Sequence, residues 1–330
     1  MKTFSTPLEA IASPESLLAA WRQYRSGKRR RPAVAWFELD AERNLLNLSE
    51  ALQAGTYRHG RYHVLEIRDP KPRLIAVASV GDRVVHRAVH AALAPLFDCR
   101  FIADSYACLP GRGSHRALLR FLELQRRFPR VMHLDVSRYF PSIDHAILLS
   151  LLSEKLRDRR VVALLTVILA SGHELYLRPS VASFYGLDRE EQRRRPCGLP
   201  IGNLTSQWWG NLYLDGFDHF VKRELKAEGY LRYMDDLVFF AHERSTLRAW
   251  RRAAEAWLSE QRRLALNLRK GHIRPTELPQ NYLGHRVTRQ GCDLGTKAVR
   301  RFRKRLPELA LGDQRRFRQS LVSWRGAVTF

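Results

Sequence analysis

Three aspartates interrupt stretches of the sequence that otherwise have the apolar character of buried strands. Asp235 and Asp236 stand together in YLRYMDDLVFF (230–240), and Asp135 ends the alternating stretch VMHLD (131–135). Strands select against Asp, and burying an unpaired carboxylate is costly. The adjacent pair therefore marks a tight turn, a site that needs negative charge, or both.

The segments that flank the pair, LRYM and LVFF, are too short to be separate elements unless Asp235 and Asp236 form the tip of a hairpin. Asp tolerates turn geometry, so a purely structural turn is one alternative. Exposed two-residue turns are more often Asn-Gly or Asp-Gly, because both central residues of the favoured turn need positive φ. Two Asp there add conformational cost and mutual repulsion. A bound divalent cation offsets both, so we expect the pair to bind Mg²⁺.

Asp135 extends this set. Alone, an Asp at the end of a strand is more often a cap or a turn residue. With Asp235 and Asp236 on a neighbouring hairpin, it completes the carboxylates that a two-metal phosphoryl-transfer site needs. In such sites two cations about 4 Å apart activate the attacking hydroxyl and stabilise the leaving pyrophosphate. The protein otherwise supplies positioning and cationic groups.

Other elements must position these groups. Residues 62–78 alternate apolar and polar side chains around Asp69-Pro70-Lys71-Pro72, which predicts a hairpin. Lys71 and Arg73 then lie at or beside the hairpin tip. A helical pattern begins at Asp82, which we expect to be its N-cap.

Two further patterns each have a plain and a functional interpretation. Gly111-Arg112-Gly113 precedes a helix that we expect Ser114 to cap, and backbone amides at such a start bind phosphate in other proteins, although two glycines are a weak signal. His86 and His90 share one helix face at a metal-binding spacing, but no third ligand accompanies them. Packing or hydrogen bonding is therefore favoured for both histidines.

The composition indicates a globular protein with a polyanionic partner. The chain has 330 residues, 45% of them hydrophobic, which suffices for a large core. Its 57 Lys and Arg against 33 Asp and Glu give a net charge of +24, which favours nucleic acid as the partner. The sequence has no stretch of about 20 apolar residues and no signal peptide, so we expect no membrane partner and a cytoplasmic or nucleoid location. The cysteines are scattered without a CxxC pair, which favours reduced thiols over a zinc site: Cys99, Cys108, Cys197 and Cys292.

Two segments are strongly basic. The run Lys28-Arg29-Arg30-Arg31-Pro32 fits a solvated linker and a phosphate contact equally well. The segment from Lys297 predicts two short basic helices, broken at Leu306-Pro307 and Gly312-Asp313. A basic helical pair fits a grip on the phosphates of a nucleic-acid duplex.

Ordered blocks around the aspartates resemble the catalytic core of reverse transcriptases. DVSRYF (135–140) and YMDD (233–236) look like the metal-binding motifs, GLPIGNLTSQWWGNLYL (198–214) like the block between them, LALNLRKGH (264–272) like the segment with a phosphate-proximal lysine, and NYLGHRV (281–287) like the primer grip. The resemblance implies an RNA-directed DNA polymerase with two Mg²⁺ ions, for which Mn²⁺ can substitute. Its implied partners are template RNA, an RNA/DNA duplex and deoxynucleoside triphosphates. It also implies a cytoplasmic protein encoded by a bacterium or a phage.

The same resemblance implies roles for single residues. The metal ligands are Asp135, Asp235, Asp236 and the carbonyl of Val136, and Lys270 joins the catalytic set as the group that protonates the leaving pyrophosphate. Phe140 matches the aromatic gate that excludes ribonucleotides. The other nucleotide-binding residues lie on the fingers hairpin, after the first motif and in the 198–214 block: Lys71, Arg73, Arg138, Tyr139, Ile201, Gly202 and Gln207. Leu283 and Gly284 match the primer grip.

GLPIGNLTSQ, together with DPKPRLI, DRVVHRA and DSYAC, is similar to the reverse transcriptases of diversity-generating retroelements. Those enzymes copy a template-repeat RNA into cDNA with errors at adenines. Many relatives carry Gln where this chain has Ile201, so we expect weaker discrimination between bases, with simple packing as the alternative. Two other functions stay open: a retron-like reverse transcriptase or one in antiviral defence, and a non-catalytic nucleic-acid-binding descendant, which the intact aspartates disfavour.

The expected fold is α+β, a right-hand polymerase with an antiparallel palm sheet, helical fingers and a small helical thumb. The expected parts are 1–130 (N-terminal segment and fingers), 131–145 (first part of the palm), 146–196 (helical connection between fingers and palm), 197–288 (palm) and 289–330 (thumb). Trp208 and Trp209 would either stack on bases or, as we favour, pack in the core. The thumb is short for a processive polymerase, so we expect an accessory protein that assists RNA binding.

Overall fold

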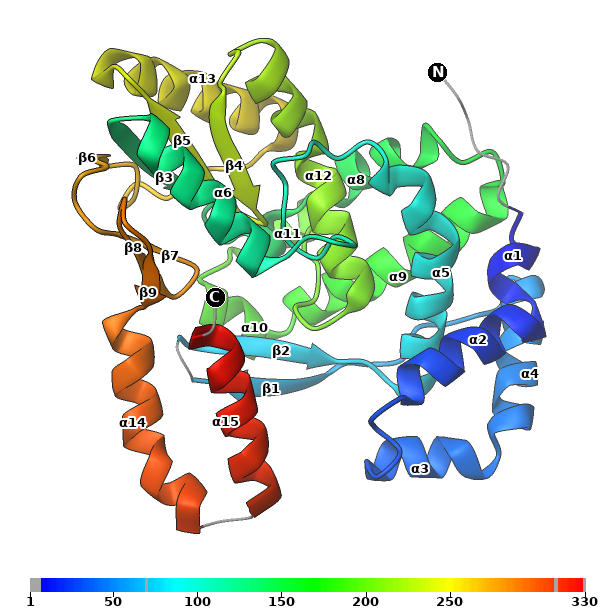
Figure 1. Cartoon of the computed structure of the whole chain (residues 1–330). Helices are drawn as coiled ribbons and strands as arrows, with labels where there is room; N and C mark the ends of the chain where they lie inside the picture. Colours follow the sequence, from blue (N-terminus) through cyan, green and yellow to red (C-terminus); the bar gives the residue numbers. More distant parts are fainter. Residues whose placement is uncertain (1–6, 69–70, 312–313, 329–330) are drawn as a thin grey trace. The chain divides into compact units, whose positions relative to one another are not determined.

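The computed structural model describes residues 7–68, 71–311 and 314–328, which form two compact units (Figure 1). Unit 1 contains the segment up to Phe101, Ser137–Asp218 and Trp257–Ala265; unit 2 contains Ile102–Val136, His219–Ala256 and the segment from Leu266. Each unit is therefore built from segments that are far apart in the sequence.

Unit 1 is mainly helical. Its helices are α1 Glu9–Ala12, α2 Pro14–Arg25, α3 Pro32–Leu39, α4 Ala41–Gln53, α5 Val80–Asp98, α7 Tyr139–Ser142, α8 His145–Ser153, α9 Arg159–Tyr176, α10 Pro179–Tyr185 and α11 Arg189–Arg194. Helix α12 (Leu204–Arg223) begins in unit 1 and ends in unit 2, and α13 (Arg244–Arg262) begins in unit 2 and ends in unit 1. No single helix of the described chain is long and apolar enough to cross a membrane, although α9 and α10, bent by 79° at their junction, pass that test as a pair.

The predicted hairpin in unit 1 is confirmed. Strands β1 (His63–Ile67) and β2 (Arg73–Val77) pair antiparallel, with His63 opposite Val77. The predicted turn residues Asp69 and Pro70 lie outside the described residues. The inner side of the hairpin packs on α9 and α10 through a buried apolar cluster: Tyr62, Ala76, Ala78, Leu175, Tyr176 and Val181.

Two predicted helix starts are wrong by a few residues. Helix α5 is capped by Ser79, whose Oγ accepts a hydrogen bond of 3.1 Å from the backbone N of Asp82, and Asp82 itself lies in the first turn. A serine three residues before an acidic residue is the better N-cap, because both side chains can satisfy free amides. Helix α6 (Ser114–Arg127, unit 2) has Gly113 at its N-cap, so Ser114 is the first helical residue.

The favoured packing of the aromatic residues in unit 1 is confirmed. Trp208 and Trp209 are 2% and 1% exposed. The ring of His90 lies edge-on to Trp208 at 6.0 Å, and His86 is buried against other polar side chains. The four cysteines are all free thiols.

A four-stranded antiparallel sheet forms the centre of unit 2, in the order β4-β5-β3-β6. Its strands are β3 Arg130–Asp135, β4 Gly229–Tyr233, β5 Asp236–Ala241 and β6 Ile273–Pro275. On β5 the run Leu237 to Phe240 is fully buried, with Phe240 in contact with Phe121 of α6 and Phe239 in contact with Trp250 of α13. Because helices cover both faces, this strand is continuously apolar.

A second antiparallel sheet and two C-terminal helices complete unit 2. The strands are β7 Gln280–Tyr282, β8 His285–Val287 and β9 Cys292–Leu294, and the helices are α14 Thr296–Leu311 and α15 Gln314–Val328. Phe302 of α14 stacks on Trp324 of α15 at 4.5 Å. The predicted break at Pro307 is wrong, since α14 continues through it. The predicted break at Gly312-Asp313 lies outside the described residues.

Candidate active site

The aspartate pair lies on the β4–β5 hairpin, but its tip is one residue earlier than predicted. Met234 and Asp235 form the turn, and Asp236 is the first residue of β5, paired with Tyr233. Met234 takes the left-handed conformation, with φ 57°, whereas Asp235 does not. The predicted conformational cost therefore falls on Met234. A non-glycine residue held in this region costs about 1 kcal/mol or more and is typical of functional sites.

Asp135 meets this hairpin at the end of β3. Strands β3 and β5 pair along their length, and the last pair in the register is Asp135 with Asp236. The backbone N of Val136 then donates to the carbonyl oxygen of Asp235 at 3.3 Å. The fold thus brings Asp135, Val136, Asp235 and Asp236 together at one end of the sheet.

A loop after α13 supplies the partners of Asp135. Lys270 Nζ lies 2.9 Å from Asp135 Oδ1, and Asn267 Nδ2 donates to Asp135 Oδ2 at 3.2 Å. The backbone N of Asn267 also donates to the carbonyl oxygen of Asp135 at 2.8 Å. Lys270 was among the predicted site residues, whereas Asn267 was missed. Its position inside LALNLRKGH was the available signal.

The oxygen-rich donors at this edge suit a hard divalent cation. Yet no group of three or more His, Cys, Asp or Glu side chains is arranged to hold a metal ion anywhere in the described ranges. Both oxygens of Asp135 are engaged by Lys270 and Asn267. A cation at Asp135 would therefore have to displace the Lys270 ammonium, which is 40% exposed and attached to a flexible stem.

The sheet beneath the aspartates is apolar and holds a neutral histidine. Burial lowers the pKa of His133 to about 4, and the nearby Lys270 and Arg274 act in the same direction. Its ring lies 5.6 Å from that of Phe121. The hydroxyl of Tyr282 is buried, and burial, together with the charge of Asp236, raises the pKa of Tyr282. These buried groups make the environment beneath the aspartates apolar.

The predicted primer-grip residues form the turn between β7 and β8. Leu283 and Gly284 both have positive φ, 46° and 85°. This is the geometry of a two-residue hairpin turn in which Asn-Gly is usual. Here a leucine occupies the first position, and its partly buried side chain packs against the apolar core of unit 2.

The predicted nucleotide-binding residues lie in unit 1. Lys71 precedes β2 and Arg73 is its first residue, opposite Ile67, and both side chains are exposed. Arg138 is the N-cap of α7 with φ 47°, and its Nη1 donates to the carbonyl oxygen of Tyr185 at 3.3 Å.

Tyr139 and Phe140 follow in α7. Tyr139 is 2% exposed, and its hydroxyl donates to the carbonyl oxygen of Gly210 at 2.5 Å, so its side chain is part of the interior. Phe140 is half-buried, and its backbone oxygen accepts from Leu199 N at 2.9 Å.

The block at 198–214 contacts the β1–β2 hairpin. The carbonyl oxygen of Ile201 accepts from Ala76 N at 2.7 Å, and the side chain of Ile201 lines a small apolar cavity with Val64 and Leu74. Gly202 has φ +123°, and a Cβ there would lie 2.7 Å from the oxygen of Ala76. Ile201 thus contacts the β1–β2 hairpin, which agrees with the packing alternative raised by the sequence. Gln207 is exposed on α12.

Comparisons with known proteins agree with the motifs. Residues 67–287 match the family described as reverse transcriptase (RNA-dependent DNA polymerase). Protein YkfC of Escherichia coli is 25% identical over 267 residues, which cover 69% of this chain and 66% of YkfC. The group II intron-encoded protein LtrA of Lactococcus lactis is 24% identical over 187 residues, 55% of this chain and 28% of LtrA. The chain thus spans less than two thirds of either relative.

Among solved structures, telomerase from Candida albicans in complex with a fragment of telomeric RNA matches with a TM-score of 0.46 and 10% identity, over 78% of this chain and 51% of that one. The mixture of helices and antiparallel sheets agrees with the predicted α+β, right-hand polymerase fold of the matching family. The family match includes every block that the sequence motifs singled out. By that match, which covers well over half of its length, the chain belongs to the reverse transcriptase family.

Proposed function

We propose that this chain is an RNA-directed DNA polymerase that adds deoxynucleotides by two-metal nucleotidyl transfer. The observation that supports it most directly is the pairing of Asp135 with Asp236 at the end of the palm sheet, with Asp235 in the adjoining turn. Three carboxylates concentrated at one edge are costly unless cations join them. Mg²⁺, or Mn²⁺ in its place, would be held by these carboxylates and the carbonyl of Val136.

When bound, the cations would lower the pKa of the attacking hydroxyl and offset charge on the phosphates. The chain itself orients the carboxylates and moves protons. Asn267 holds Asp135 through its side chain and its backbone. Lys270 compensates Asp135 in the free protein and, once released, can give its proton to the leaving pyrophosphate.

The residues of unit 1 would bind the nucleotide. Lys71 and Arg73 would contact the triphosphate, since planar Arg suits phosphate oxygens. The backbone amides of Arg138 and Tyr139 would add to this, and Phe140 would meet the sugar.

Gly202 and Gln207 would also line the nucleotide site. Leu283 and Gly284 would support the primer end. The division into fingers, palm and thumb over the ranges given above belongs to the same proposal.

Template RNA and its duplex with DNA are the proposed partners. A cluster of cations in unit 1 supports this: Lys28 Nζ lies 5.0 Å from the centroid of the Tyr24 ring, and Arg83 Nη1 donates to the Tyr24 hydroxyl at 3.0 Å. Burial lowers the pKa of Lys28, and the nearby Arg87, Arg31 and Arg83 lower it further. Such a group of like charges fits a chain of phosphates. We also propose an accessory protein that assists RNA binding.

Within the family, we propose a diversity-generating role with errors at adenines. The apolar Ile201 supports it, because a side chain without donors cannot respond to the geometry of a base pair. A retron-like or antiviral role is the alternative, which the genes beside this one would distinguish. Replacing Ile201 by Gln and sequencing the cDNA tests the assignment: misincorporation at adenines should fall, and an unchanged error rate would reject it.

Primer extension on an RNA template with Mg²⁺ tests the polymerase activity. Asp235→Asn should reduce incorporation by about a thousandfold or more, because it removes a metal ligand. The matched control is Asp293→Asn on β9, an exposed aspartate of unit 2, which should retain activity. Equal incorporation by wild type and Asp235→Asn would reject the metal-site assignment. Absence of incorporation by the wild type in the presence of its RNA would favour the non-catalytic alternative.

A further inference from the structure

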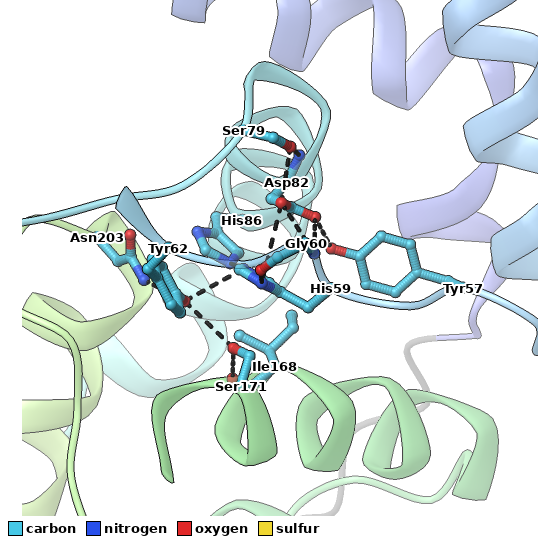
Figure 2. Close-up of polar contacts among 10 residues, drawn as sticks. All are labelled: Tyr57, His59, Gly60, Tyr62, Ser79, Asp82, His86, Ile168, Ser171 and Asn203. Atoms are coloured by element: carbon cyan, nitrogen blue, oxygen red, sulfur yellow. Dashed lines mark hydrogen bonds and ion pairs between the residues drawn. The ribbon is translucent and has the colours of Figure 1, made fainter. Parts of the chain in front are cut away.

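A buried polar network in unit 1 converges on the hydroxyl of Tyr62 (Figure 2). Asn203 Nδ2 donates to Tyr62 Oη at 2.7 Å. His59 Nε2 and Ser171 Oγ lie 3.1 and 3.2 Å from the same oxygen. The hydroxyl therefore links the loop before β1 to helix α9 and to the block at 198–214.

The rings of His59 and His86 stack beside Tyr62, with centroids 5.1 Å apart. His59 Nδ1 donates to the carbonyl oxygen of Gly60 at 2.6 Å, since that oxygen can only accept. The Nε2 atoms of His59 and His86 lie 3.1 Å apart. Burial lowers the pKa of His86 to about 3, with His59 acting in the same direction.

Asp82 fixes the other side of this loop. Its carboxylate accepts from the hydroxyls of Tyr57 and Ser79 at 2.7 Å each, and from the backbone N of Gly60 at 3.2 Å. Figure 2 shows these groups around the start of α5. Residues 57–62 are thus bound at both ends to the interior of unit 1.

The block at 201–203 holds the β1–β2 hairpin at three points. The carbonyl oxygen of Ile201 accepts a hydrogen bond from Ala76 N. Because Gly202 has no Cβ, the backbone of β2 can approach it closely. The side chain of Asn203 donates to the hydroxyl of Tyr62. Tyr62 directly precedes β1, whereas Ala76 lies in β2, so both strands of the hairpin are secured.

We propose that Tyr62 is a positioning residue for the incoming nucleotide: held by Asn203, it fixes the β1–β2 hairpin and so sets where Lys71 and Arg73 reach. This rests on the proposed function, which assigns those two cations to the triphosphate. The proposed metal-binding aspartates lie in unit 2. Loss of the contact between Tyr62 and Asn203 should therefore weaken nucleotide binding and leave the chemical step intact.

Tyr62→Phe tests the proposal, because it removes the hydroxyl and keeps the ring. The KM for deoxynucleotides should rise about fivefold, because the hydroxyl that holds the hairpin is lost, while kcat stays within about twofold. Amide hydrogen exchange within β1 and β2 should become faster. Asn203→Ser, whose side chain is too short to reach Tyr62, should reproduce both effects.

Tyr185→Phe is the matched control. Tyr185 packs on the same cluster, but its hydroxyl makes a single long contact of 3.4 Å to the carbonyl oxygen of Leu74. A similar rise in KM in this control would overturn the proposal, since it would indicate general softening. Unchanged hydrogen exchange in Tyr62→Phe would also overturn it, and that readout is independent of polymerase activity. Failure of the wild type to polymerise would instead contradict the proposed function.

Discussion

Asp82 in unit 1 and Asp135 in unit 2 are two largely enclosed carboxylates that are compensated in different ways. The side chain of Asp82 is 5% exposed and accepts hydrogen bonds from neutral donors in the interior: Tyr57, Ser79 and Gly60. His59 Nδ1 lies 3.9 Å from its Oδ2. The side chain of Asp135 is 20% exposed, accepts from Asn267 Nδ2 and pairs with the ammonium of Lys270. The partners of Asp82 are fixed, whereas the lysine partner of Asp135 can be replaced by a divalent cation.

This difference separates a structural carboxylate from a candidate ligand. Rigid neutral donors hold a negative charge in one geometry and stabilise the fold. At Asp135, Asn267 orients the carboxylate, whereas the ammonium of Lys270 neutralises it from a flexible stem that an incoming cation can displace. Asp135 should therefore matter for activity, and Asp82 for stability.

Asp82→Asn is the strongest test of the structural role of Asp82. The Nδ2 group of the new asparagine is a donor, and it would face the hydroxyls and the backbone N–H group that now donate to Asp82. A buried polar group left unpaired in this way costs about 1 to 3 kcal/mol. We expect the free energy of unfolding to fall by about 3 kcal/mol, a loss of more than a hundredfold in the folding equilibrium constant. Urea denaturation followed by tryptophan fluorescence would measure it.

Asp40→Asn is the control for that experiment. Asp40 is 54% exposed and pairs only loosely with Arg43, at 3.5 Å. An exposed pair of this kind contributes about 0 to 1 kcal/mol. If both variants lost the same stability, the structural role of Asp82 would be wrong.

Acid should weaken the network around Tyr62 as well. The pKa of His86 is about 3 in the folded protein because the ring is buried, against an ordinary value of 6.5. As the pH falls below 6.5, His86 becomes protonated in the unfolded chain but stays neutral in the folded protein. The contribution of His86 to the free energy of unfolding is therefore complete above pH 6.5 and decreases between pH 6.5 and about pH 3. The loss is about 1.4 kcal/mol per pH unit within this window.

His86→Gln tests this dependence, because Gln keeps a polar side chain at this position but does not titrate. The midpoint of urea denaturation should fall less steeply with acid in this variant than in the wild type. His63→Gln, at an exposed position of β1, should keep the wild-type slope. Part of the slope should persist in His86→Gln, since burial also lowers the pKa of His133 and of His145 to about 4. An identical slope in His86→Gln and wild type would contradict the assignment.

The central strands of unit 2 were predictable because their signals are local. Alternation along VMHLD and the apolar run around Asp235-Asp236 predicted β3 and the β4–β5 hairpin, and both are present. The tip was misplaced because the pairing of β5 with β3 extends to Asp236, and sequence alone does not show where cross-strand pairing stops.

The network around Tyr62 was missed for a different reason. Its members, from Tyr57 to Asn203, are far apart in the sequence. Asp82, His86 and Asn203 belong to quoted motifs, but a motif does not show which distant side chains its residues contact. Tertiary packing alone brings them together. Asp82 even appeared as a helix cap, because sequence reasoning considers the nearest backbone amides and not a loop that returns from elsewhere.

Lys270 offers the smallest and most specific test of the comparison. Because its ammonium occupies Asp135 at 2.9 Å, Mg²⁺ must compete with it. Lys270→Met should therefore lower the Mg²⁺ concentration that gives half-maximal thermal stabilisation, by about threefold, as fits a partly exposed ion pair. Arg269→Met removes a neighbouring exposed cation and controls for net charge. An equal shift in both variants would mean that Mg²⁺ binding depends only on the overall charge. The proposed exchange of Lys270 for Mg²⁺ at Asp135 would then be wrong.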